Sequence, residues 1–120
     1  MIKVLIVGGK LQGTEIAYLA QKAGYYSVLV DKRPAIPAGG LVNEHIQEDI
    51  FAEPEMLPVF QKADVIIPAV EDKSVLDKIA DYAKITQTPL VFDQNAYRLS
   101  SSKKASNDWF ERLGLSVPAP

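Results

Sequence analysis

The first feature that could do chemistry is a glycine-containing loop, Gly8-Gly9-Lys10-Leu11-Gln12-Gly13. An apolar run precedes the loop, and apolar residues at helical spacing follow it. A loop in this position leads into a helix N-terminus, where free backbone N–H groups and the helix dipole favour an anion. The sequence therefore predicts that a phosphate or carboxylate group binds here. The expected binding residues are Gly9, Lys10, Leu11, Gln12 and Gly13.

The loop departs from the fingerprint of dinucleotide-binding proteins, which has glycine at its first, middle and last conserved positions. If Gly8 and Gly13 are the first and last of these, Lys10 stands in the middle. A side chain there occupies space that the phosphates of a nicotinamide dinucleotide need. The same lysine could instead reach over the loop and pair with an anion. A purely structural tight turn is the alternative interpretation.

Two acids directly follow apolar segments that read as strands. Asp31 follows residues 27–30, and Glu71 follows residues 65–70. A carboxylate at the end of a strand can accept a hydrogen bond from a ribose hydroxyl or a ligand amine. We therefore predict that Asp31 binds a cofactor and that Glu71 binds a substrate. The alternative for Glu71 is an acid favoured by the dipole of the following helix, which Asp72 is expected to cap.

The elements that must position these residues alternate between strand and helix. We expect strands at 2–7, 27–30, 46–51, 65–70 and 89–92, and helices at 12–23, 53–62 and 72–84. Residues 32–43 should form an irregular connection, and a last helix should run from Ser102 to Gly114. Pro58 predicts that the helix at 53–62 is broken or kinked. Pro68 predicts that the ladder of the fourth strand ends there.

This alternation predicts an α/β fold with a Rossmann-like, doubly wound parallel sheet of about five strands in the order 3-2-1-4-5. In such sheets, ligands bind beyond the carboxyl ends of the strands where the order reverses, here between the first and fourth strands. The glycine loop and the turn at 70–72 should therefore flank one crevice. We expect this domain to span 1–100, with a helix and a linker at 101–120.

Composition restricts the function further. The chain has 120 residues, no cysteine, 13 basic and 15 acidic residues, and a net charge of −2. Disulfides and thiolate metal sites are therefore excluded, and the charge gives no general reason to bind nucleic acid. No apolar run reaches the roughly 18–20 residues that cross a bilayer, and the start lacks a signal-peptide pattern, so we expect a cytoplasmic protein. A single histidine, His45, gives no basis for a metal or catalytic site, and we assign neither.

The last part of the chain resembles the junction between domains in ATP-grasp ligases. In that family, a lysine opens a helix, a glycine closes it, and a proline-containing segment then enters the ATP-binding domains. Lys103 and Gly114 keep the family's spacing of eleven residues. The string Gly-Gly-Lys-Leu-Gln-Gly, with the segments at 28–32 and 91–98, is similar to the N-terminal domain of these ligases, especially in the pyrrolysine-biosynthesis branch. The resemblance covers nearly the whole chain.

This resemblance implies the pre-ATP-grasp domain of a ligase that forms an amide bond through an acyl phosphate. It implies ATP as cofactor, with Lys103 near the ATP phosphates, and Mg²⁺ held in later domains that this chain does not contain. The catalytic residues are expected beyond Pro120, so the chain alone should be inactive. The implied partner is a small molecule, an amino acid such as lysine or an ornithine derivative, rather than nucleic acid or a membrane. A homodimer is left open.

Two other functions were weighed. A free-standing domain that senses NAD(H) or another nucleotide would have a similar length, a glycine loop and an acid at a strand end. Lys10 and the segment from Lys103 to Pro120 argue against it. A short-chain NAD(P) oxidoreductase would need a catalytic Tyr-x-x-x-Lys motif, which does not follow.

Overall fold

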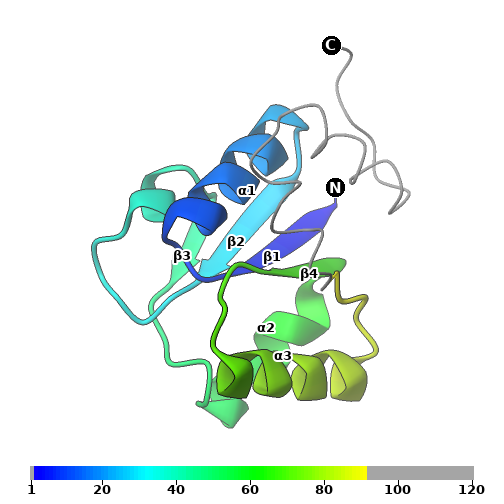
Figure 1. Ribbon diagram of the computed structural model, residues 1–120. Helices are drawn as coiled ribbons and strands as arrows, with labels where there is room; N and C mark the ends of the chain where they lie inside the picture. The colour runs from blue at the N-terminus through cyan, green and yellow to red at the C-terminus, as the bar shows by residue number, and fades with distance from the viewer. Residues whose placement is uncertain (1, 92–120) are drawn as a thin grey trace.

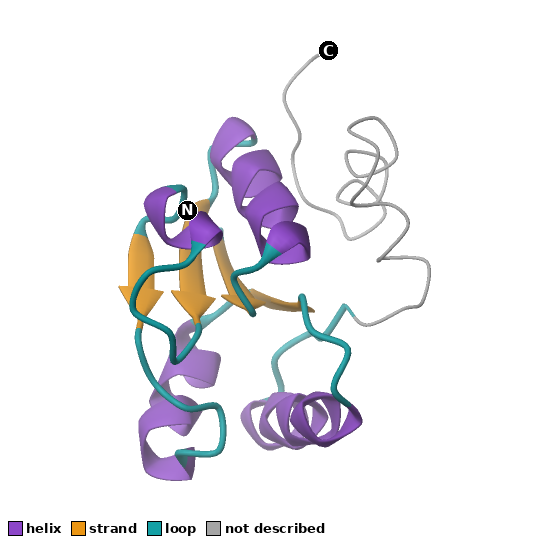
Figure 2. Ribbon diagram, turned by 60° about the vertical axis from the view of Figure 1, so that its left-hand side comes forward, coloured by secondary structure: helices purple, strands orange, loops and turns teal. Residues whose placement is uncertain are grey.

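The computed structural model describes residues 2–91, which form a parallel β-sheet with helices on both faces (Figures 1 and 2). The elements in chain order are β1 (Lys3–Val7), α1 (Leu11–Lys22), β2 (Tyr26–Val30), the 3₁₀ helix η1 (Pro37–Gly40), β3 (Glu44–Ile46), α2 (Glu53–Lys62), β4 (Val65–Pro68) and α3 (Lys73–Thr86). The expected last helix, Lys103 and the linker at 101–120 lie outside the described residues.

The strand order is β3-β2-β1-β4, and all pairs are parallel. This confirms the doubly wound arrangement for the first four strands. The described residues contain no fifth strand. In its place, Leu90 forms a single parallel bridge with Ile66 of β4. The N–H of Ile66 donates to the Pro89 carbonyl, and the N–H of Val91 donates to the Ile66 carbonyl, each at 2.9 Å. The segment therefore lies where the fifth strand was expected.

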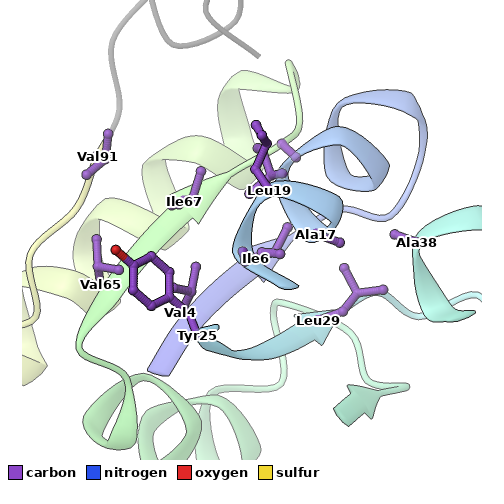
Figure 3. Close-up of a cluster of buried hydrophobic side chains, with 13 residues drawn as sticks. Val4, Ile6, Ala17, Leu19, Tyr25, Leu29, Ala38, Val65, Ile67 and Val91 are labelled. Carbon is purple, nitrogen blue, oxygen red and sulfur yellow. The ribbon is translucent and has the colours of Figure 1, made fainter. Parts of the chain in front are cut away.

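Strands β1, β2 and β4 are largely apolar on both faces because each face is buried under a different pair of helical elements. On β1, Val4 and Ile6 join the cluster beneath α1 and η1, whereas Leu5 and Val7 join the cluster beneath α2 and α3. Figure 3 shows the first of these clusters, in which side chains from α1 meet those of the sheet. This two-sided burial explains why the strands read as continuous apolar runs.

The prediction of a strand at 46–51 is wrong. The third strand is shorter and earlier, at Glu44–Ile46. The Asp49 carboxylate accepts a hydrogen bond from the Phe51 N–H at 2.9 Å, which turns the chain. Ile50 is buried in the cluster beneath α2 and α3, so its apolar character reflects burial in a turn rather than a strand.

A break at Pro58 is also wrong, because α2 runs without interruption from Glu53 to Lys62, whereas the alternative of a kink stays a prediction. Pro58 removes one backbone donor, but Met56 and Phe60 on either side of it are fully buried. Packing of this apolar face stabilises a short helix more than one hydrogen bond does. The expected end of the ladder at Pro68 is confirmed.

The helix at 72–84 is confirmed as α3, and Asp72 is its N-cap. The Asp72 carboxylate accepts hydrogen bonds from the N–H groups of Ser74 at 2.9 Å and Val75 at 3.3 Å. None of the helices in the described part of the chain combines the length and apolar character needed to cross a membrane.

The first prediction concerns the contact between β1 and α1. A Cβ atom at Gly13 would lie 1.9 Å from the Gly8 carbonyl oxygen, so Gly13→Ala must push the helix away from the strand end. We expect a loss of about 1–3 kcal/mol in the free energy of unfolding, measured by urea denaturation. Gly40→Ala is the control, because a Cβ there meets no atom within 4 Å. Equal stability of the two variants would contradict the close contact.

Candidate functional site

The sheet brings three strand ends together at one edge. Val7 at the end of β1 pairs with Val30 of β2 on one side and with Pro68 of β4 on the other. The next residues, Gly8, Asp31 and Ala69, therefore leave the sheet side by side. This is the point where the strand order reverses, and ligands of doubly wound sheets bind there.

A crevice of about 410 Å³ opens at this point. The glycine loop and the turn after β4 both line it, as the strand order predicted. Its lining residues are Gly8, Lys10, Leu11, Gln12, Arg33, Ala69, Val70, Glu71 and Asp72.

Close contacts favour glycine in the loop, most strictly at Gly8 and Gly13, where a Cβ would meet backbone atoms. Gly8 has a φ of +104°, and a Cβ there would lie 2.6 Å from the Val70 side chain. A Cβ at Gly9 would lie 2.1 Å from Cδ1 of Ile36. Together with Gly13, these contacts let the chain turn from β1 into α1 within a few residues. The structural interpretation of the loop is therefore sufficient to explain its glycines.

The backbone N–H groups of the loop divide into two sets. Those of Gly8 and Gly9 are used inside the protein, by the Val30 carbonyl at 3.0 Å and by Oδ2 of Asp31 at 2.9 Å. Those of the first turn of α1, at Leu11, Gln12 and Gly13, have no acceptor within residues 2–91. Lys10, the N-cap residue, is exposed, and its side chain makes no capping bond. The second set and the lysine can hold an anionic group.

Asp31 lies at the end of β2 as predicted, but its carboxylate is already engaged. Oδ2 accepts from the Gly9 N–H and pairs with Nη2 of Arg33. Oδ1 accepts from the backbone N–H of Arg33 at 2.9 Å and from its Nε at 2.8 Å. The two oxygens thus accept four hydrogen bonds, about as many as a carboxylate can.

These contacts also control the ionisation of Asp31. Burial would raise the pKa of this carboxyl group, which is 7% exposed. The hydrogen bonds from Arg33 and Gly9 and the charge of Arg33 outweigh burial and lower the pKa to about 2. Asp31 and Arg33 are therefore a charged pair at neutral pH.

Sequence reasoning missed Arg33. It lines the crevice, and its side chain is 39% exposed. The signal that could have found it is its spacing from Asp31, because an aspartate commonly accepts a hydrogen bond from the backbone N–H two residues later.

The two acids after β4 have different surroundings. Asp72 caps α3, whereas Glu71 is exposed and has no hydrogen-bond or ion-pair partner in the described part of the chain. Glu71 is thus the carboxylate available to a ligand in this crevice. Within residues 2–91, no group of three or more His, Cys, Asp and Glu residues could hold a metal ion. Lys103 lies outside the described residues.

A second crevice of about 280 Å³ adjoins the first and shares Gly8, Arg33 and Val70 with it. Its other walls are mostly apolar and also include charged residues. These other lining residues are Val7, Val30, Asp31, Lys32, Glu48, Asp49, Ile50, Phe51 and Val75.

Comparison with curated proteins finds ligases. The chain is 37% identical over 119 residues to the 3-methyl-D-ornithine–L-lysine ligase of Methanosarcina barkeri, an alignment that covers 98% of this chain and 33% of that protein. The chain therefore spans about a third of the length of the curated relatives it matches. No protein-family model matches it.

Solved structures give a consistent picture. N5-carboxyaminoimidazole ribonucleotide synthetase from Thermotoga maritima has a TM-score of 0.67 at 21% identity, covering 99% of this chain and 32% of that chain. The N5-carboxyaminoimidazole synthetase from Staphylococcus aureus, solved with ADP, has a TM-score of 0.64 at 25% identity, covering 94% of this chain and 30% of that chain. Together these findings confirm the expected resemblance to ATP-grasp ligases and to the pyrrolysine-biosynthesis branch.

The second prediction concerns Asp31. Asp31→Asn removes the charge that Arg33 pairs with, so we expect a loss of about 2 kcal/mol in the free energy of unfolding at pH 7, in keeping with a pKa of about 2. Because the folded-state pKa is the lower one, this stabilisation is present above about pH 4. It should disappear as the pH falls toward 2.

Urea denaturation of both proteins between pH 7 and pH 2 measures this difference. Asp77→Asn is the control, because the Asp77 side chain is 65% exposed and pairs with an exposed lysine, its one ion-pair partner among residues 2–91. This substitution should change the free energy of unfolding by no more than about 0.5 kcal/mol. A difference for Asp31→Asn that does not change with pH would contradict the assigned charge pair.

Proposed function

We propose that this chain is the substrate-binding domain of an ATP-dependent ligase that joins a carboxylate to an amine. The observation that carries the proposal is the crevice at the strand switch point. It combines donors for an anion, at Lys10 and the first turn of α1, with a carboxylate for an amine, at Glu71. The similarity to ligases over nearly the whole chain supports the reaction class.

In this reaction, ATP supplies a phosphoryl group to the substrate carboxylate, and the amine then displaces phosphate from the acyl phosphate. The described residues fit the binding of an anionic group and an amine. They do not fit Mg²⁺, since residues 2–91 contain no suitable cluster of ligands. We therefore propose that this domain holds and orients a substrate, while Mg²⁺ binds in other domains together with the catalytic residues.

We further propose that the substrate is an amino acid, lysine or an ornithine derivative, as the names of the relatives suggest. The glycine loop would hold its anionic group or a phosphate of the nucleotide. Asp31 would act through Gly9 and Arg33 rather than by touching the ligand, because its oxygens are already filled.

The same geometry weakens the alternative of an NAD(H)-sensing domain. That function needs an acid at the end of β2 that accepts hydrogen bonds from a ribose. Asp31 stands at this place but already accepts four hydrogen bonds from Gly9 and Arg33. Lys10 also occupies the position where a dinucleotide needs glycine.

The third prediction is a comparison of ligands. In a titration followed by amide NMR shifts, D-ornithine, L-lysine or ATP should move the resonances of Leu11, Gln12 and Gly13, because their N–H groups lack acceptors in the described structure. NADH should cause no larger shifts of these amide resonances than those three ligands do. Shifts with NADH alone would favour the sensing domain, and no shift with any ligand would make the loop structural.

An ATP-dependent ligation assay of the full-length gene product with L-lysine and D-ornithine tests the reaction itself.

The fourth prediction concerns Lys10. Lys10→Ala removes a charged partner of the bound anion, so the affinity should fall by about 1–3 kcal/mol in the same titration. Lys22→Ala is the matched control, because Lys22 is an exposed lysine in the last turn of the same helix. Equal losses in the two variants would show that only the net charge matters and would contradict a contact at Lys10.

A further inference from the structure

Arg33 stands where the two crevices meet. It lines both of them, as do Gly8 and Val70. A ligand in either crevice would therefore reach the same side chain.

The guanidinium of Arg33 is held in one position by Asp31. The Asp31 side chain is 5% exposed, and it engages Nε and Nη2 of Arg33. A guanidinium has five N–H donors. The remaining three have no acceptor within residues 2–91, and the Arg33 side chain is 39% exposed. An arginine fixed on one edge can offer its other edge to a second carboxylate in a bidentate pair.

The first crevice also contains the opposite charge. Glu71 lines it without a partner in the described structure, whereas the neighbouring Asp72 is used to cap α3. A fixed cation and an available anion in one crevice match the two charged groups of an amino acid. The apolar walls of the adjoining second crevice suit an aliphatic side chain.

We propose that Arg33, positioned by Asp31, binds the carboxylate of the amino-acid substrate, and that Glu71 binds its ammonium group. This inference rests on the proposed function, since it names the residue that recognises the substrate in that site. Arg33 is a specificity-determining residue, because a ligand without a carboxylate loses the contact. Asp31 is a positioning residue, because it acts on the substrate through Arg33.

The test compares two ligands and two variants of the chain by NMR titration. D-ornithine carries the carboxylate, and 1,4-diaminobutane is the matched amine that lacks it. Arg33→Lys keeps a cation beside Asp31 but removes the planar fork, so the fold is retained more readily than in Arg33→Met. Lys22→Met is the control, because Lys22 is an exposed lysine in the last turn of α1 and lines neither crevice.

We expect Arg33→Lys to bind D-ornithine at least about tenfold more weakly than the wild-type chain and 1,4-diaminobutane equally well. Lys22→Met should bind D-ornithine within about twofold of wild type. The amide spectrum and the urea midpoint of each variant show whether it is folded.

If the wild-type chain binds D-ornithine and Arg33→Lys binds it as tightly, the inference about Arg33 is overturned while the proposed function stands. If Arg33→Lys loses the same affinity for D-ornithine and for 1,4-diaminobutane, the inference is also overturned, because the loss is then independent of the carboxylate. If the wild-type chain binds neither D-ornithine nor L-lysine, the proposed function fails, and the inference fails with it.

Discussion

The buried carboxylate of Asp31 is the interaction on which the rest of the site depends. It joins the end of β2 to the glycine loop through the Gly9 N–H and to the following loop through Arg33. His45 of β3 adds a further tie, since its Nε2 lies 3.1 Å from the Asp31 carbonyl oxygen, an acceptor to which the ring nitrogen must donate. One residue thus links β2 and β3 to the loop that opens α1.

The second constraint is the close approach of β1 and α1. Gly8 turns with a positive φ, and Gly13 lets its helix approach the Gly8 carbonyl, so the first turn of α1 begins directly beside the strand end. Asp31 takes up the N–H of Gly9, while those of the next residues have no acceptor in the described structure. The same geometry therefore stabilises the loop and leaves donors for a ligand. The crevice results from how the strand ends and the helix start are joined.

Much of this arrangement was readable from the sequence, because two-sided burial produces apolar runs and amphipathic helices produce a regular spacing. The order β3-β2-β1-β4, the bounds of α2 and the cap at Asp72 followed from such patterns. The strand at 46–51 was misplaced because a buried side chain in a turn, Ile50, resembles one in a strand. The effect of Pro58 was overestimated because packing of α2 on the sheet is not visible in a local pattern.

The site was predicted less completely than the fold. Position alone identified Asp31 as an acid at a strand end, but only the structure shows that its partners are Gly9 and Arg33. Arg33 itself belongs to an irregular segment whose path no periodicity predicts. Its place beside the crevice depends on a hydrogen bond to a buried side chain, which is a tertiary contact.

If Asp31 holds the glycine loop in place, the loss of its carboxylate should expose the Gly9 amide, and amide hydrogen exchange measures this exposure. The wild-type chain should protect the Gly9 N–H, because it donates to Asp31 inside the protein at 2.9 Å. In Asp31→Ala, this amide should exchange much faster, while the amide of Ile6 in the middle of β1 keeps its protection. Unchanged protection of Gly9 in the folded variant would contradict the claim.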